Sequence, residues 1–206
     1  PEMVWYNAEE NMRFQEALIK YIVKYVIENN EQDLLTLGRK PEEIDISNKV
    51  FEVLWYDDAI RLLNKNRFDI KWGEDIRVEP EEFLSNQFNA PFFVYKYPTA
   101  CRAFYIEPDP ERPELSLSND CLAPGGYGEV ITGGQRASNY EFLVKQLKKF
   151  NLNIKNFKWY LDLRKYGSVP HSGFGMGIER LMRWICNVRH IRETIPFPRT
   201  LKRCYP

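Results

Sequence analysis

Residues 172–181 read SGFGMGIERL, and three glycines in this stretch alternate with larger apolar residues. An alternation of period two is typical of a β-strand, where it would place the glycines on one face and Phe174, Met176 and Ile178 on the other. The glycine face would expose bare backbone, against which a flat aromatic group could lie. Close packing of another element on that face would explain the glycines equally well. A helix is expected to follow at about 178–187.

Arg180 would lie in the first turn of this helix, where a cation opposes the helix dipole. An anionic partner would compensate, and a polyphosphate fits because a guanidinium binds phosphate oxygens in a bidentate way. A salt bridge to an acid such as Glu179 or Glu193 is the alternative. A dinucleotide-binding loop is disfavoured, since no Val- and Ile-rich strand precedes Gly173.

The remaining pattern predicts helices first, then strands with helices inserted, and a last helix. A long helix is expected at 7–30, with Asn7 and Glu10 in capping-box spacing. Its expected apolar stripe consists of Phe14, Leu18, Tyr21, Ile22, Tyr25 and Val26. Further helices are expected at 57–66, 138–150, where Ser138 would be the cap, and 157–165. Strands are expected at 91–97, 103–106 and 115–122, and a pair of strands within 123–136. This order indicates an α+β fold with a mainly antiparallel sheet.

The composition is that of a folded chain with no dominant charge. The 206 residues are 44% hydrophobic and 28% charged, and 29 basic residues balance 29 acidic ones. Binding of nucleic acid by charge alone is therefore disfavoured. The four cysteines show no CxxC spacing, which argues against structural zinc and is typical of reduced, cytoplasmic proteins. No apolar run approaches the ~20 residues that cross a membrane.

Several motifs resemble one enzyme family. GFGMGIER (173–180) resembles motif 3 of class II aminoacyl-tRNA synthetases. Around it, YLDLRKYGSVPHSGFGMGIERLMRWIC (160–186) and IRETIPFPR (191–199) are similar to asparaginyl-tRNA synthetases, as is LAPGGYGEVITGGQR (122–136). The resemblance runs through the whole chain. It implies a single domain over 1–206, the C-terminal portion of a class II catalytic domain, with motif 3 near 172–187.

The resemblance also implies a site, residue by residue. Arg180 would be catalytic and would hold the γ-phosphate of ATP, while Gly175 and Gly177 would form the floor under the adenine. Glu129 would bind ATP and, together with Asp120, Mg²⁺, which prefers oxygen ligands. The implied reaction is direct attack of a carboxylate on the α-phosphate, so that catalysis is positioning and charge stabilisation. The implied amino-acid pocket is lined by Gln135, Arg136, Arg164, His171 and Ser172.

Parts of the family pattern are not visible in this sequence. PEMVWYNAEENM (1–12) resembles the residues just after motif 2, and neither motif 1 nor the anticodon-binding domain is found. In the family, an arginine of motif 2 holds the α-phosphate. Removing one donor to a transition state typically lowers the rate by ~10²–10³. Weak or absent adenylation is therefore expected from this chain alone.

Three functional hypotheses follow. The first is an asparaginyl-tRNA synthetase-like enzyme that activates asparagine with ATP, for ligation to tRNA(Asn). The second is a paralog that makes asparagine from aspartate, ATP and ammonia. The third is a truncated, non-catalytic remnant that binds a nucleotide or a partner. Expected partners are ATP with asparagine or aspartate, a weakly held tRNA, and a second copy of the chain, because an exposed sheet edge favours self-association.

Overall fold

A computed structural model describes residues 1–205 of the chain. Its strands form one six-stranded sheet in the order β1-β6-β5-β4-β3-β2. The strands are β1 Glu2–Val4, β2 Val53–Trp55, β3 Phe92–Tyr95, β4 Ser118–Ala123, β5 Gly128–Gln135 and β6 His171–Met176. The helices are α1 Ala8–Asn29, α2 Glu31–Thr36, α3 Tyr56–Lys65, α4 Val78–Ser85, α5 Tyr140–Lys149, α6 Lys158–Lys165 and α7 Ile178–Ile185.

The sheet is antiparallel except at one edge. Strand β2 runs parallel to β3, and the other four pairings are antiparallel. The predicted α+β fold with a mainly antiparallel sheet is therefore confirmed. The register between β4 and β5 shifts once, so that Asp120 pairs with Thr132 while Leu122 pairs with Glu129. This bulge brings Glu129 onto the same face of the sheet as Asp120 and Thr132.

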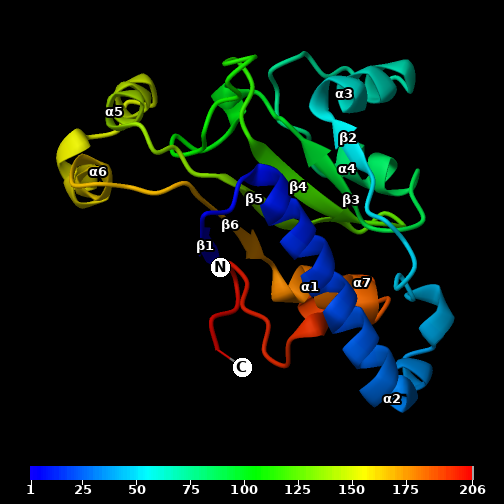
Figure 1. The fold of residues 1–206 in the computed structure, drawn as a ribbon. Helices are drawn as coiled ribbons and strands as arrows, with labels where there is room; N and C mark the ends of the chain where they lie inside the picture. Colours follow the sequence, from blue (N-terminus) through cyan, green and yellow to red (C-terminus); the bar gives the residue numbers. More distant parts are fainter. Residues whose placement is uncertain (206) are drawn as a thin grey trace.

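Helix α1 lies across one face of the sheet, with α7 beside it (Figure 1). The capping box of Asn7 and Glu10 is present, and the main core of the molecule forms beneath the helix. The apolar stripe of α1 was predicted only in part. Leu18, Ile22 and Val26 pack half-buried against this core. Its buried side chains include Met12, Ile19 and Val23, whereas Tyr21 and Tyr25 are exposed. Buried Asn11 and Gln15 occupy the core-facing positions that an apolar count misses.

The opposite face is covered only at its two ends. Helices α3 and α4 pack there against Phe92, Val94 and Leu122, while α5 and α6 form a separate cluster with Ala137. Figure 1 shows the two helix pairs at opposite ends of the sheet. Between them, Thr132 and Gly175 are exposed although they lie on inner strands. We call this side, with Asp120, Glu129, Thr132 and Gly175, the open face.

Several predicted elements were wrong or missing. Residues 103–106 form turns instead of a strand, and Ile106 contributes only an isolated bridge with Arg136. The stretch 123–136 holds the single strand β5, which pairs with β4, instead of a pair of strands of its own. Strand β2 and helices α2 and α4 lie in segments where no element was expected. Strand β2 and helix α2 are three and six residues long, and helix α4 begins without a side-chain cap. Without length or a cap, the sequence carries little local signal for them.

Two predicted helix caps were also wrong. Helix α5 is capped by Asn139, whose side chain accepts a hydrogen bond from the Phe142 amide, so the cap is one residue later than Ser138. Asp57 lies inside the first turn of α3 instead of preceding it. Its carboxylate pairs with Arg112 and accepts a hydrogen bond from the indole of Trp72.

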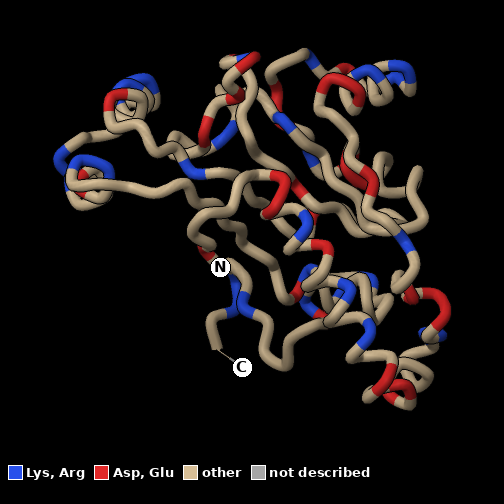
Figure 2. The backbone as a smooth tube through the Cα atoms, in the orientation of Figure 1, with Lys and Arg blue, Asp and Glu red and all other residues tan. Residues whose placement is uncertain are grey.

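Acidic and basic residues are scattered over the backbone, most of which carries neither (Figure 2). Basic residues gather on α7, which carries Arg180 and Arg183. Within residues 1–205, no helix is long and apolar enough to cross a membrane.

Candidate active site

The glycines of β6 behave differently from one another on the open face. No atom lies within 4 Å of the position that a Cβ of Gly175 would occupy, so the backbone there is bare. At Gly173, by contrast, a Cβ would lie 2.4 Å from Cδ of Glu2, so that glycine permits close packing of β1. Gly177 ends the strand and is the N-cap of α7. Of the two predicted floor residues, Gly175 therefore lies on the exposed floor and Gly177 at its rim.

Arg180 and Glu129 meet at one end of this floor. Nη1 of Arg180 lies 2.9 Å from Oε1 of Glu129 and 3.0 Å from its carbonyl oxygen. The acid that compensates Arg180 is thus Glu129, rather than Glu179 or Glu193. The guanidinium is still about half exposed, with 49% of the side-chain surface accessible. It can therefore donate further hydrogen bonds to an anion that enters from solvent.

Asp120 lies beneath this pair and is almost completely buried. One carboxylate oxygen forms an ion pair with Arg102, whose guanidinium carbon stacks 3.5 Å from the ring centroid of Tyr97. The other oxygen, Oδ1, is buried and has no hydrogen-bond partner within the described residues. Burial and the nearby charge of Asp120 raise the pKa of Glu129. Two of the predicted site carboxylates therefore share one electrostatic environment.

A divalent cation would fit these carboxylates only with help from a ligand. Among residues 1–205, no group of three His, Cys, Asp or Glu side chains could hold a metal ion by itself. Asp120 and Glu129 do supply hard oxygen donors, and Oδ1 of Asp120 is unpartnered. Mg²⁺ is commonly bound by one or two carboxylates, with phosphate oxygens and water completing the coordination. The donor set fits a cation that arrives with a polyphosphate.

Glu81 is a third carboxylate at this end, and it was not among the residues predicted from the sequence. It lies on α4, and its Oε2 accepts a long hydrogen bond of 3.4 Å from the amide of Glu129. Burial raises the pKa of Glu81 to about 8, and the charges of Glu129 and Asp120 add to the effect. The only sequence signal was a cluster of acids at 79–82, which is usually a solvated surface.

The other end of the open face carries a cluster around Arg164. This side chain is 8% exposed, and its Nε donates to the carbonyl of Ala137 over 3.1 Å. Nη2 donates to the hydroxyl of Tyr160 over 2.8 Å and lies 3.3 Å from Nε2 of His171. Because Nδ1 of His171 lies 2.8 Å from the carbonyl of Val169, Nδ1 carries the proton and Nε2 is the acceptor. The network fixes the guanidinium in place.

Arg136 lies near this cluster and is held by an ion pair with Glu2 of β1. Its Nη2 and Nε donate to Oε1 and Oε2 of Glu2 at 2.6 and 3.2 Å, a bidentate pair. A cavity of about 330 Å³ separates these groups from α6. Its lining includes three predicted residues, Arg136, Arg164 and His171, together with Glu2 and Tyr160, which were not predicted.

Gln135 and Ser172 are placed on the other side of the sheet. Oε1 of Gln135 accepts a hydrogen bond of 3.1 Å from the Ala8 amide, and the hydroxyl of Ser172 donates to the carbonyl of Asn7 over 3.3 Å. These contacts hold the start of α1 against the sheet. The structure therefore does not bring the two residues together with Arg164, because successive strand residues point to opposite faces.

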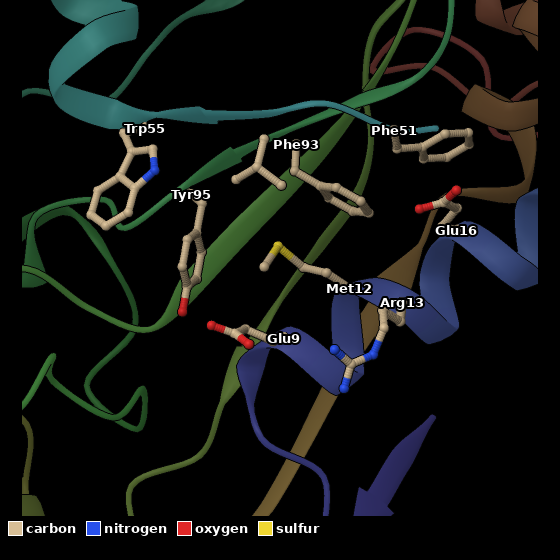
Figure 3. Close-up of a pocket in the computed structure, with 9 residues that line it drawn as sticks. Glu9, Met12, Arg13, Glu16, Phe51, Trp55, Phe93 and Tyr95 are labelled. Atoms are coloured by element: carbon tan, nitrogen blue, oxygen red, sulfur yellow. The ribbon is translucent and has the colours of Figure 1, made fainter. Parts of the chain in front are cut away.

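A separate cavity of about 360 Å³ lies on the α1 side, between α1 and strands β2 and β3 (Figure 3). Charged Glu9, Arg13 and Glu16 of α1 face aromatic side chains that include Phe93 and Tyr95. None of the predicted site residues lines this cavity. The predicted site residues other than Gln135 and Ser172 lie on the open face or at its two ends.

Comparisons with known proteins agree on one family. The family model described as tRNA synthetases class II (D, K and N) matches residues 1–201. The asparagine--tRNA ligase of Lactobacillus gasseri is 48% identical over 207 residues, covering 100% of this chain and 48% of that protein. That of Pelotomaculum thermopropionicum is 47% identical over 205 residues, with the same coverage of both chains.

Solved structures show the same likeness. The crystal structure of asparaginyl-tRNA synthetase from Pyrococcus horikoshii superposes with a TM-score of 0.96 at 39% identity, covering 100% of this chain and 49% of that one. A second structure of that enzyme is complexed with asparaginyl-adenylate and also has a TM-score of 0.96. Aspartyl tRNA synthetase from Entamoeba histolytica has a TM-score of 0.90 at 27% identity. The chain spans about half the length of these relatives.

Proposed function

Because this chain belongs to the class II tRNA synthetases for aspartate, lysine and asparagine, we propose that it binds ATP and asparagine for asparagine activation. The adenylate formed would then react with tRNA(Asn). The observation that carries the proposal is the arrangement of the open face. A polyphosphate-type cluster at Arg180 and an amino-acid-type cluster at Arg164 lie at the two ends of bare backbone at Gly175.

At the first end, the adenine would lie on the peptide planes around Gly175, where no side chain intervenes. Arg180 would donate to the γ-phosphate, with Glu129 fixing the direction of the guanidinium. Asp120 and Glu129 would hold Mg²⁺ together with the phosphates, and the cation would neutralise charge on the polyphosphate. The side chains of this end would bind and orient ATP without forming a covalent intermediate.

At the second end, Arg164 and Glu2 together suit a side-chain amide. The Arg164 guanidinium can donate to the amide oxygen of asparagine, and the Glu2 carboxylate can accept from its NH₂ group. An aspartate carboxylate has no hydrogen to donate to Glu2, so that hydrogen bond would be lost. This pairing is the physical reason for proposing asparagine rather than aspartate.

The reaction requires the α-phosphate of ATP and the α-carboxylate of asparagine to meet on the open face, between Arg180 and Arg164. An oxygen of the asparagine α-carboxylate forms a bond to the α-phosphorus, and the bond from that phosphorus to the bridging oxygen of the β-phosphate breaks. Pyrophosphate leaves with the electron pair. Charge grows at the α-phosphate, and a donor there is typically worth ~10²–10³ in rate. By resemblance that donor belongs to motif 2, so we expect slow adenylation by this 206-residue chain.

The test is exchange of labelled pyrophosphate into ATP, run with asparagine and with aspartate in separate reactions. We expect slow exchange that depends on asparagine, and a fall of about 10² or more in Arg180→Gln. The matched control is Arg61→Gln, because Arg61 lies on α3 with 77% of its side chain exposed. Exchange that depends on aspartate would contradict the substrate. Asparagine formation from aspartate and ammonia would favour the paralog hypothesis instead.

A further inference from the structure

Arg102 is a buried arginine that contacts the proposed cation ligand Asp120. It follows the short 3₁₀ turn Thr99–Cys101, between β3 and β4, and 11% of its side chain is exposed. Its Nη2 forms an ion pair with Oδ2 of Asp120 and lies 3.9 Å from Oδ1 of Asp75. One guanidinium nitrogen thus faces two acids, of which Asp120 is almost completely buried and Asp75 is exposed. Asp120 is therefore the main partner of Arg102.

An aromatic ring fixes the guanidinium of Arg102 beside Asp120. Its Cζ lies 3.5 Å from the ring centroid of Tyr97, a side chain that is fully buried. The Tyr97 ring packs in turn against Tyr56, with the two centroids 5.2 Å apart, inside the core cluster next to α3 and α4. A planar guanidinium stacks well on an aromatic face. The stack sets the direction from which Asp120 is held.

Asp120 differs from the other buried aspartate, Asp109, in what its oxygens contact. Both oxygens of Asp109 are used within the fold, since Oδ1 accepts from the amide of Glu111 over 2.9 Å and Oδ2 pairs with Lys96. In Asp120 the ion pair with Arg102 uses Oδ2 alone, and Oδ1 has no hydrogen-bond partner among residues 1–205. A buried carboxylate oxygen without a partner is destabilising, so Oδ1 is suited to a group that a ligand supplies.

The charges around Asp120 decide how strongly a cation is attracted there. Arg102 pairs with Asp120, and Arg180 pairs with Glu129, so each proposed cation ligand already has a positive neighbour. These four groups carry no net charge, and a free divalent cation would meet two guanidinium groups together with the two acids. A cation that arrives with a polyphosphate brings the missing negative charge and further oxygen ligands. Cation and nucleotide should therefore bind together.

We propose that Arg102 is a positioning residue for Asp120, which holds Oδ2, leaves Oδ1 for the cation, and cancels the charge that would otherwise bind a free cation. Binding of the divalent cation then depends on the nucleotide that accompanies it. The place of the nucleotide in this inference rests on the proposed function. The charge balance between Arg102 and Asp120 does not, and it can be tested without any reaction.

The experiment measures binding of Mn²⁺, which takes the same oxygen ligands as Mg²⁺, to the 206-residue chain with and without a non-hydrolysable ATP analogue. In the unmodified chain we expect tight binding of Mn²⁺ only with the analogue. Arg102→Met removes the charge, keeps an unbranched side chain over Tyr97 and supplies no oxygen ligand. We expect it to raise the affinity for Mn²⁺ without nucleotide by at least about tenfold.

Two further variants separate charge from shape. Arg102→Lys keeps the charge and loses the planar stack, so its affinity for free Mn²⁺ is expected to stay close to that of the unmodified chain. Arg61→Met is the matched control, because it changes the net charge equally at a position on α3 where 77% of the side chain is exposed. It is expected to leave Mn²⁺ binding unchanged.

The stability of Arg102→Met needs its own measurement, because removing one partner of a buried ion pair leaves the other uncompensated. A cation that binds the folded chain raises its melting temperature, so thermal unfolding with and without Mn²⁺ remains informative for a weakened fold. Without nucleotide, we expect Mn²⁺ to raise the Tm of Arg102→Met more than that of the unmodified chain or of Arg61→Met. A variant that folds only with Mn²⁺ would give the same answer.

Without nucleotide, Mn²⁺ binding to Arg102→Met that is no tighter than in the unmodified chain would overturn the proposal. An equal gain in Arg102→Lys or Arg61→Met would overturn it as well. The outcome is separable from that of the proposed function. Asparagine-dependent exchange by the unmodified chain, with no gain of Mn²⁺ affinity in Arg102→Met, would remove the role of Arg102 alone. A gain in Arg102→Met with no effect of the ATP analogue on any chain would remove the proposed nucleotide site and keep the charge balance at Asp120.

Discussion

Arg164 is a buried cation without an acid to balance it. It donates to the carbonyl of Ala137 and the hydroxyl of Tyr160, yet within residues 1–205 it forms no salt bridge. Burying an uncompensated charge is destabilising unless polar groups surround it. The hydroxyl, the carbonyl and the His171 ring accept hydrogen bonds from the guanidinium, but none of them carries a negative charge that would compensate it. A polar ligand with a free oxygen would complete this arrangement.

The discrimination between asparagine and aspartate should depend on Glu2. In Glu2→Gln the side chain keeps its shape and can donate a hydrogen bond to a carboxylate oxygen of aspartate, which Glu2 cannot do. We expect the affinity for aspartate to rise relative to asparagine by about tenfold, which is roughly 1.4 kcal/mol. Competition binding with the two amino acids in the presence of ATP measures this ratio. The bidentate pair with Arg136 weakens as well, so Arg136→Gln is the control for that loss. An unchanged ratio would exclude Glu2 from recognition.

Glu81 should make the stability of the chain fall as the pH rises. Its pKa is raised from 4.5 to about 8 on folding, so between these values the folded chain binds a proton that the unfolded chain has lost. The free energy of unfolding then decreases with increasing pH across this window. Glu81→Gln is neutral throughout and lacks this decrease. We expect the variant to gain stability relative to the unmodified chain from pH 5 to pH 8.

Urea unfolding of both chains at pH 5, 6.5 and 8 checks this expectation. Glu82→Gln is a suitable control, because Glu82 is the neighbouring acid on α4. A stability difference between the Glu81 variant and the unmodified chain that stays constant with pH would show that Glu81 is ionised in the folded chain.

At the level of elements, glycines in β5 and β6 have two different roles: one permits close packing and the other leaves the backbone exposed. A Cβ at Gly133 would lie 2.8 Å from Cβ of Phe174 and 3.0 Å from the carbonyl oxygen of Gly173, so this glycine permits packing. Gly175 has open space on the other face. We expect Gly133→Ala to destabilise the fold by about 1–3 kcal/mol. Gly175→Ala should change stability by less than ~0.5 kcal/mol.

For ATP binding we expect the opposite order, with Gly175→Ala the more damaging of the two substitutions. A methyl group at Gly175 would occupy the floor on which the adenine is proposed to lie, and we expect Gly175→Ala to weaken ATP binding by about tenfold. Thermal unfolding and ATP titration of the two variants test both halves. Normal ATP affinity in Gly175→Ala would place the base elsewhere on the molecule.

The β6–α7 unit was predictable because its pattern is local. Alternating glycines indicate a strand, the apolar run after residue 177 indicates a helix, and both elements are confirmed at His171–Met176 and Ile178–Ile185. The site around it was only partly predictable. Glu81 and Arg102 reach it from distant segments, and no short pattern marks either of them. The side that Gln135 and Ser172 face depends on the strand register, which the sequence leaves open.

For the molecule as a whole, the chain spans about half the length of its relatives and still forms a six-stranded sheet with its own core. Both ends of the open face lie within it. Strands β1 and β2 are the two edges of the sheet, and each is three residues long. Short edge strands limit, but do not abolish, pairing with another chain. Sedimentation over a range of concentrations should show whether the expected self-association occurs.

The most direct test of the account is binding of a non-hydrolysable sulfamoyl analogue of asparaginyl-adenylate, compared with the aspartyl analogue, by calorimetry. This measurement needs no turnover and joins both ends of the open face in one ligand. We expect the asparaginyl analogue to bind at least about tenfold more tightly, and Arg164→Lys to abolish most of its affinity. Failure of both analogues to bind, or tighter binding of the aspartyl analogue, would contradict the assignment of the open face to asparagine activation.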